Sequence, residues 1–334
     1  MFILLGISVL LAALLTFNTL ASLGAATLWR IGHRFTRHWS ARASARILYL
    51  LGVLPATLGI TFVLFLLAPA YLELEPRTTA ERVSLKLAII AFASAVGMGL
   101  AIIRGVAAWR ATARLTADWL AHGEPISFPQ VAIPAYRIEH QFPVIAIVGV
   151  LRPRLFLASQ IFQSLTPAEI AAAVEHATGH LVAHDNLKRG LLRACRDVTL
   201  IIPCGRALDR AWAEASESAA DEHAARRDRT VALDLASALV KIARMIPAGA
   251  KPAMPAGAFL IGDEESSGVK ARVRRLIQIA SSGGGTAVYE PLLTKLAMWA
   301  CFALVFPILA IIQSNPHVLP AVHSLIERVV AFLT

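Results

Sequence analysis

Four long apolar segments constrain the fold of this chain more than any other feature of its sequence. They extend over about Phe2–Leu28, Ile47–Tyr71, Leu85–Trp109 and Leu292–Ile312. Each provides the ~20 apolar residues that a helix needs to cross the hydrocarbon core of a bilayer. Hydrophobic residues make up 57% of the 334 residues, more than a soluble chain of this length usually contains. The sequence therefore predicts a mainly α-helical membrane protein with four transmembrane helices.

The distribution of charge predicts the orientation of these helices, because cytoplasmic loops carry an excess of arginine and lysine. The first connection contains five arginines and no acidic residue, whereas the second contains three glutamates and two arginines. Basic residues also flank the long region between the third and fourth segments. We therefore expect a multi-pass protein of a bacterial-type inner (plasma) membrane, with this region cytoplasmic and both termini outside. The net charge of +10 reflects this topology. Since there is no basic recognition helix, nucleic acid is not an expected partner.

The long central region contains two histidines, His176 and His180, in the stretch VEHATGH. Residues four apart share one face of a helix, about 6 Å apart along its axis, so both imidazoles can reach one zinc ion at ~2.0–2.1 Å. In the zinc-peptidase motif H-E-x-x-H, the glutamate after the first histidine is the general base that activates water. Ala177 stands in that place. The spacing of the ligands is intact and the base is missing.

A second helical stretch can complete such a site. Glu217 and Asp221 lie about one turn apart in an Ala- and Glu-rich segment. Catalytic zinc takes three protein ligands, and a ligating histidine usually donates its other N–H to a carboxylate or carbonyl. We therefore predict one zinc ion per chain, with Glu217 as the third ligand and Asp221 orienting His176. His184 is not expected to be a ligand, since three side chains along one straight helix span about 12 Å.

Simpler interpretations of these residues remain open. The two histidines can be a structural pair, and the two carboxylates can form a solvated face beside Arg226 and Arg227. Peptide hydrolysis would also require a donor that stabilises the oxyanion. His223, Arg226 and Tyr136 are candidates for that role, and the sequence does not choose among them.

Four separated motifs resemble the BlaR/MecR-type antirepressor metallopeptidase family. They are Pro143–Leu157, which contains GVLRP, then Leu165–Ile170 (LTPAEI), the histidine motif followed by Asp185–Leu187 (DNL), and Arg272–Leu276 (RVRRL). The resemblance covers roughly residues 125–280. It implies a zinc-dependent endopeptidase domain of the gluzincin kind, related to HtpX-like membrane proteases.

The same resemblance implies roles for individual residues. His176, His180 and Glu217 take the places of the zinc ligands, and Asp221 takes the place of the neighbouring carboxylate. Ala177 occupies the place of the general-base glutamate. Relatives cut a transcriptional repressor or themselves, so the expected partners are a protein or peptide substrate of that kind and the lipid bilayer.

The chain is expected to contain three parts. Residues 1–111 form three transmembrane helices with their connections. Residues 112–290 form the cytoplasmic zinc metallopeptidase domain, an α+β domain with a small β-sheet. Residues 291–334 form the fourth transmembrane helix and an amphipathic helix over Pro316–Thr334, which we expect on the outer surface of the membrane. That last part is too short for the extracellular sensor domain that antibiotic-sensing relatives carry.

Strands are expected at Ser127–Ala132, Pro143–Gly149 and Leu155–Ala158, the last two joined at Arg152-Pro153. Loops are expected at Pro252–Gly268 and Gly283–Gly285. A strand beside the histidine helix can offer its edge to an extended substrate, or can simply be a buried strand of the sheet.

These patterns together predict an integral-membrane zinc endopeptidase that acts on a cytoplasmic or membrane-proximal protein. With Ala177 in place of the base, this chain is predicted to be inactive. We favour an introduced Glu→Ala change, because a decayed site would more often have lost its ligands too. The alternative is a natural pseudopeptidase that binds and regulates a partner without cutting it. A membrane scaffold or channel with an incidental zinc site is a third reading.

Overall fold

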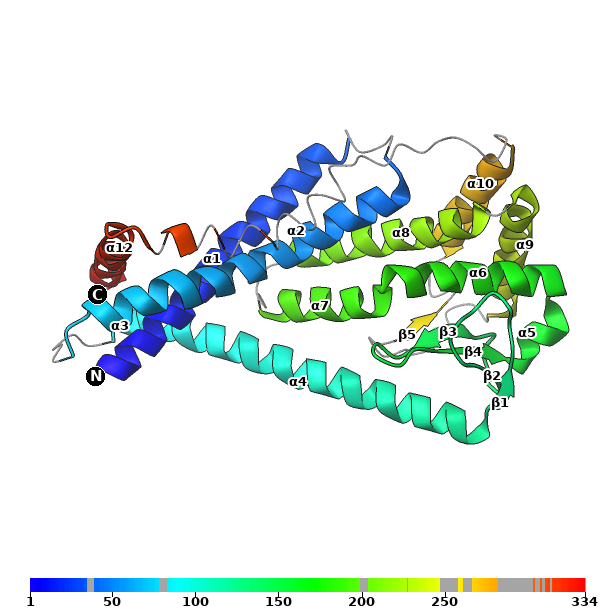
Figure 1. Cartoon of the computed structure of the whole chain (residues 1–334), viewed down its shortest axis with the longest axis horizontal. Helices are drawn as coiled ribbons and strands as arrows, with labels where there is room; N and C mark the ends of the chain where they lie inside the picture. Colours follow the sequence, from blue (N-terminus) through cyan, green and yellow to red (C-terminus); the bar gives the residue numbers. More distant parts are fainter. Residues whose placement is uncertain are drawn as a thin grey trace.

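The computed structural model is a mainly helical molecule in which long apolar helices lie beside a region that contains a small sheet (Figure 1). It describes residues 1–34, 39–77, 83–198, 204–226, 228–246, 258–260, 266–281, 303, 307, 310–312 and 314–333. Among these residues, three helices are long and apolar enough to cross a membrane: Phe2–Gly32, Ala41–Leu74 and Leu85–His122. They correspond to the first three predicted membrane helices. The fourth, Leu292–Ile312, lies almost entirely outside the described residues.

The first helix is α1 (Phe2–Gly32), and the second consists of α2 (Ala41–Phe62), a π-helical turn η1 (Val63–Leu67) and α3 (Ala68–Leu74). The third, α4 (Leu85–His122), begins where the Ser84 side chain accepts a hydrogen bond from the Leu87 N–H. Its 38 residues extend over about 57 Å at ~1.5 Å per residue, well beyond a ~30 Å hydrocarbon core. The C-terminal part of α4 therefore lies alongside the region of the sheet (Figure 1).

Five strands form one mixed sheet in the order β1-β2-β4-β3-β5. They are β1 (Glu124–Ile126), β2 (Ala135–Ile138), β3 (Ile145–Val148), β4 (Arg154–Ala158) and β5 (Ala258–Leu260). Strands β2 and β4 are parallel, and the other three neighbouring pairs are antiparallel. The predicted pair joined at Arg152-Pro153 is confirmed as β3 and β4, with Ala146 opposite Phe156.

Two other predictions in this region were wrong. No strand forms over Ser127–Ala132, because Pro129 has no N–H to donate to a ladder and Val131 N–H instead donates to Phe128 O in a turn. Within the expected loop Pro252–Gly268, the described residues are 258–260, which form strand β5, and 266–268, which begin the next helix; the rest of this loop and the loop expected at Gly283–Gly285 lie outside the described residues. A three-residue strand carries too little periodicity to be recognised in a sequence, and pairing with β3 fixes it.

The next six helices after β4 in the described part of the chain are α5 (Ser159–Ser164), α6 (Pro167–Ala183), α7 (Asp185–Val198), α8 (Cys204–Ala225), α9 (Arg229–Met245) and α10 (Ser266–Ser281). The main core joins the sheet to α6, α9 and α10, with Phe156, Val174, Leu239 and Leu276 buried in one cluster. Glu222 of α8 accepts hydrogen bonds from the backbone N–H of Ala41 and thereby connects this region to the start of α2.

The predicted C-terminal amphipathic helix forms as α12 (Val318–Leu333). Its apolar residues Ile326 and Val330 are buried in a cluster that includes Leu5 of α1 and Tyr71 of α3. The helix therefore packs on the ends of the long apolar helices, as Figure 1 also shows. Its place on the outer surface of a membrane stays a prediction.

Candidate metal centre

Helices α6 and α8 approach each other closely at Gly179. A Cβ atom at this position would lie 3.0 Å from Ala220 Cα and 3.3 Å from Ala220 Cβ. Glycine therefore lets α8 lie closer to α6 than any other residue would. The approach brings Glu217, one turn before Ala220, to His176 and His180 on α6, and all three side chains are buried.

The three predicted ligands converge on one point. His176 Nε2 lies 3.2 Å from His180 Nε2 and 3.6 Å from Glu217 Oε2, and His180 Nε2 lies 3.7 Å from Glu217 Oε1. Ligands bonded at ~2.0–2.2 Å in a tetrahedron would be separated by roughly 3.3–3.6 Å. The two distances to Glu217 run to its two different oxygens, and with one ligand atom taken from each residue the three atoms lie within 4.8 Å of one another. This buried group could hold a metal ion.

The outer nitrogen of each histidine faces a carboxylate. His176 Nδ1 lies 2.9 Å from Asp221 Oδ1, and His180 Nδ1 lies 2.8 Å from Asp185 Oδ2. Each Nδ1–H donated in this way leaves the Nε2 lone pair directed at the shared point, which is the usual arrangement of metal-binding histidines. Glu217 Oε2 is also buried, and its close neighbour is Arg272 Nη1 at 2.7 Å, an ion pair that keeps this carboxylate ionised as a ligand must be. The residues present therefore fit a metal ion.

Asp185 reaches His180 because the chain turns sharply between α6 and α7. His184 ends α6 in the left-handed conformation, with φ 55° and ψ 39°, and is the only described non-glycine residue with positive φ. This turn starts α7 at Asp185, whose carboxylate also accepts a hydrogen bond from Ser216 on α8 at 2.6 Å. His184 is thus a helix-end residue, in agreement with its predicted exclusion from the ligand set.

Arg272 of α10 lies across the two acidic residues of α8. Its guanidinium donates to both oxygens of Asp221, at 2.8 and 2.7 Å, and its Nη1 lies 2.7 Å from Glu217 Oε2. Arg272 is only 5% exposed, so this ion pairing takes place in the protein interior. Its bidentate geometry fixes the carboxylate that in turn faces His176.

The surroundings of these groups set their pKa values. Burial would raise the pKa of Glu217, but Arg272 and the two histidines outweigh it and lower the pKa to about 2. The pKa of Asp221 is lowered in the same way, by Arg272 and by its hydrogen bond to His176. Burial lowers the pKa of His180 in spite of Asp185. Burial would lower the pKa of His176, but its hydrogen bonds with Asp221 and Glu217 outweigh burial and raise it. Near neutral pH Glu217 is thus ionised and His180 neutral, the forms that bind metal, whereas a metal ion would have to displace a proton that these carboxylates favour on His176.

The position of the missing base is also buried. Ala177 is 4% exposed and belongs to the main core cluster, and its methyl group can accept no proton. The neighbouring Glu175 does not replace the base. Its Oε1 lies 3.5 Å from His223 Nε2, away from the ligands, as expected for a residue ~100° further around the helix.

The three oxyanion candidates lie in different surroundings. His223 lies between Glu175 and Arg42, with its Nδ1 3.5 Å from Arg42 Nη2. Arg226 is exposed just beyond the end of α8. Tyr136 is on β2 and stacks on Phe156 with ring centroids 5.6 Å apart.

The strand edge beside the histidine helix is already paired. Strand β3 forms ladders with β4 on one side and with β5 on the other, where Ala146 is opposite Leu260. An extended peptide could therefore pair with β3 only if residues 258–260 left that edge.

Two residues of the centre had no predicted role. Asp185 and Arg272 lie inside the DNL and RVRRL motifs, so the signal was present in the sequence. Their roles depend on the left-handed turn at His184 and on the placement of α10. No family model matches the chain, and comparison with curated proteins finds no match.

Proposed function

We propose that this chain is a multi-pass membrane protein of zinc metallopeptidase architecture, with its general-base position occupied by Ala177. The observation that carries the proposal is the buried group of His176, His180 and Glu217, whose ligand atoms all lie within 4.8 Å of one another. Ordinary structural histidines need neither this convergence nor a carboxylate on each outer nitrogen. Two nitrogen ligands and one carboxylate form the set found in many zinc hydrolases, which is why we name zinc.

In this proposal each residue has a definite role. His176, His180 and Glu217 hold the metal, which when bound would polarise water and a peptide carbonyl as a Lewis acid. Asp221 and Asp185 keep the two histidines in the ligating tautomer. Arg272 balances the charge of the buried carboxylates, so that Glu217 is held in one orientation when the metal is absent.

The step that this chain lacks is proton transfer. A glutamate at position 177 would accept the proton of the attacking water and pass it to the leaving amine. Removal of such a base typically slows a reaction by about 10²–10⁴-fold. We therefore propose that the chain binds substrate and metal but turns over negligibly. The proposed substrate is a cytoplasmic or membrane-proximal protein, such as a repressor or the chain itself.

The proposal is tested by restoring the base. Ala177→Glu should produce a cleavage product in cells, at least about 10²-fold above background. Ala177→Gln is the matched control, because it has the same size and cannot act as a base. Cleavage should disappear when Ala177→Glu is combined with His180→Ala. Identical product patterns for the Glu and Gln forms, with zinc bound in both, would rule out the peptidase proposal.

A second candidate is a pseudopeptidase that binds a partner without cutting it. It is favoured by the packing of Ala177, which is buried in the main core. If alanine at position 177 is required for this packing, a longer side chain there would destabilise the protein. In this case Ala177→Glu should lower thermal stability as much as Ala177→Gln does, and neither form should cleave any protein.

The location proposed for the metal centre is the cytoplasm. The arginine-rich connection between α1 and α2 supports this orientation. Cysteine introduced at Ser44 near the start of α2 should be protected from an impermeant thiol reagent in intact cells, whereas cysteine at Leu74 should be labelled. The reverse pattern would place the centre outside.

A further inference from the structure

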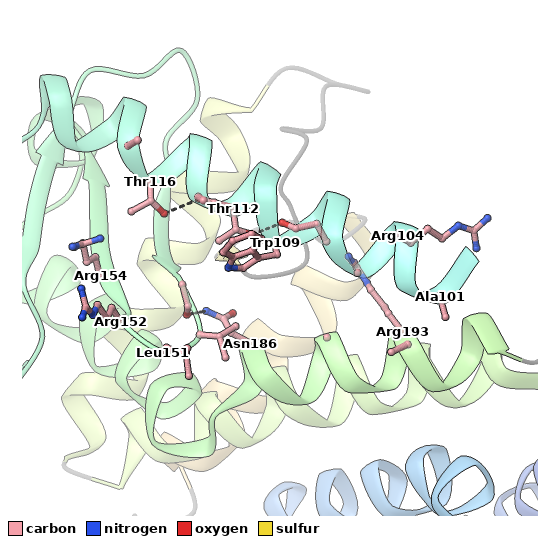
Figure 2. A pocket seen from close by; sticks show the side chains of 18 of the residues that line it. Ala101, Arg104, Trp109, Thr112, Thr116, Leu151, Arg152, Arg154, Asn186 and Arg193 are labelled. Carbon is pink, nitrogen blue, oxygen red and sulfur yellow. Dashed lines mark hydrogen bonds between the residues drawn. The ribbon is translucent and has the colours of Figure 1, made fainter. Parts of the chain in front are cut away.

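A groove separate from the metal centre runs between α4, the β3–β4 hairpin and α7. Its volume is about 1210 Å³, above the ~300–1,000 Å³ usual for small-molecule sites. Along α4 it extends from Ala101 to Leu120, and its other walls include Leu151 at the hairpin and Arg193 on α7 (Figure 2). The groove contains none of the candidate metal ligands.

The α4 wall of the groove is apolar in spite of its two threonines. The hydroxyl of Thr112 donates to Ala108 O and that of Thr116 donates to Thr112 O, each at 2.8 Å. These hydroxyls are thus satisfied within their own helix. Large apolar side chains line the groove on both sides, since Trp109 of α4 is 71% exposed and Leu151 of the hairpin is 94% exposed. Figure 2 shows Trp109 extending from α4 toward the space between α4 and the hairpin.

The groove is also strongly basic. Among the described residues, its lining contains five arginines, Arg104, Arg152, Arg154, Arg193 and Arg196, and a single acidic residue, Asp197. That one carboxylate already lies 3.1 Å from Arg104 and 3.5 Å from Arg196, and Arg196 also pairs with Asp209 at 2.6 Å. The hairpin arginines, Arg152 and Arg154, form no ion pair with the described residues. The lining therefore keeps a clear excess of positive charge. An anionic group is the complementary occupant.

The position of the groove along α4 limits what that occupant can be. A ~30 Å crossing that starts at Leu85 uses about 20 residues and ends near Gly105. The groove begins at Ala101, so one end lies at the edge of the hydrocarbon core and the rest lies at headgroup depth and beyond. Tryptophan and arginine are the residues that meet lipid headgroups at this depth.

We propose that this groove binds an anionic phospholipid, with its acyl chains against the apolar wall of α4 and its phosphate at Arg152 and Arg154, which lie together at the hairpin end of the groove (Figure 2). A transmembrane helix of another protein would match the apolar wall but would leave the arginine excess without counter-charge. The proposal does not rest on the proposed peptidase function, because it requires neither a metal ion nor a residue at position 177.

The test uses the full chain and short-chain lipids. Dioctanoyl phosphatidylglycerol should raise the thermal unfolding temperature in a saturable way and remain bound at about one molecule per chain in native mass spectrometry. Dioctanoyl phosphatidylcholine and inorganic phosphate should do neither at the same concentration. An equal effect of phosphatidylcholine would reduce the groove to a non-specific apolar surface. An equal effect of inorganic phosphate would make it a simple anion site. Either result would overturn the proposal.

Substitutions locate the site. The double change Arg152→Gln and Arg154→Gln should weaken phosphatidylglycerol binding roughly 10–30-fold. Arg110→Gln is the matched control, since Arg110 is exposed on α4 next to Trp109 but does not line the groove. Equal weakening by both changes would contradict the assignment.

Tryptophan quenching gives an independent readout of the acyl chains. In phosphatidylcholine vesicles, brominated phosphatidylglycerol should quench more fluorescence than brominated phosphatidylcholine does. This additional quenching by brominated phosphatidylglycerol should be lost in Trp109→Phe. An excess that persists in that variant, or a protein segment crosslinked to Trp109 in place of lipid, would refute the proposal.

Discussion

Gly179→Ala should separate the two helices that form the metal centre. On an open helix face, replacement of glycine by alanine usually gains about 0.8–1.0 kcal/mol. At Gly179 the new Cβ would lie 3.0 Å from Ala220 Cα and 3.1 Å from His223 Cβ. Neither atom can rotate away, so α6 and α8 must move apart by a few tenths of an ångström. Overpacking of this kind costs about 1–3 kcal/mol.

The matched control is Gly190→Ala in α7, because a Cβ at Gly190 meets nothing within 4 Å. We expect Gly190→Ala to raise the thermal unfolding temperature slightly and Gly179→Ala to lower it or leave it unchanged. The difference between the two variants, about 1–3 kcal/mol, is several degrees for a chain of this size. It can be measured by thermal unfolding of the metal-free proteins in detergent.

The same displacement should weaken metal binding. Metal sites tolerate changes of only about ±0.2 Å in their distances, and Glu217 is on the helix that moves. We expect Gly179→Ala to lower zinc affinity about tenfold or more in competition with a chromophoric chelator, while Gly190→Ala leaves it unchanged. If both variants gain the same stability and keep the same affinity, close packing at Gly179 does not position Glu217.

Three further changes test the surroundings of the centre. Asp185→Asn should lower zinc affinity about 10–100-fold, because His180 loses the carboxylate that fixes its tautomer; an unchanged affinity would dismiss that role. Arg272→Gln should destabilise the metal-free protein by about 3–5 kcal/mol, since two buried carboxylates lose their counter-charge, and added zinc should recover part of the loss in a thermal shift assay. If zinc recovers none of the lost stability, Arg272 and the metal do not neutralise the same carboxylates. Burial would raise the pKa of Glu169, but hydrogen bonds from Lys241, Ser237 and the Thr166 N–H lower it to about 2, below its ordinary value of 4.5. Its stabilisation is therefore complete above pH 4.5 and lost as the pH falls toward 2. Because the Lys241 side chain is 40% exposed, we expect Glu169→Gln to remove only about 1–2 kcal/mol at pH 7 and to flatten the acid limb of the stability curve. Parallel acid limbs for the two proteins would refute this assignment.

Much of the architecture could be predicted from the sequence because its signals are local. Apolar segments of sufficient length predicted four membrane helices, of which the three among the described residues are long and apolar enough to span, and the spacing of His176 and His180 placed both on one helix face. Glu217 and Asp221 could be assigned to a second helix because their separation also matches one helical turn. In the structure these four side chains come together.

The remaining features depend on contacts between distant parts of the chain. Asp185 faces His180 only because His184 adopts a left-handed conformation, which nothing near it in the sequence requires. Arg272 reaches Asp221 across 51 residues. Strand β5 has three residues and exists through its ladder with β3. The strand expected over Ser127–Ala132 failed for a local reason, since Pro129 interrupts it.

The central claim of this account is that His176, His180 and Glu217 bind one metal ion. The most direct measurement is the zinc content of the full-length protein after equilibration with zinc and gel filtration. We predict about one zinc per chain with Ala177 in place, and almost none in His180→Ala or Glu217→Gln. Glu175→Gln, one residue from a ligand, should keep its zinc as the matched control. Circular dichroism should show that the metal-free variants remain folded. A chain without stoichiometric zinc, or stoichiometric zinc retained in His180→Ala combined with Glu217→Gln, would contradict the claim.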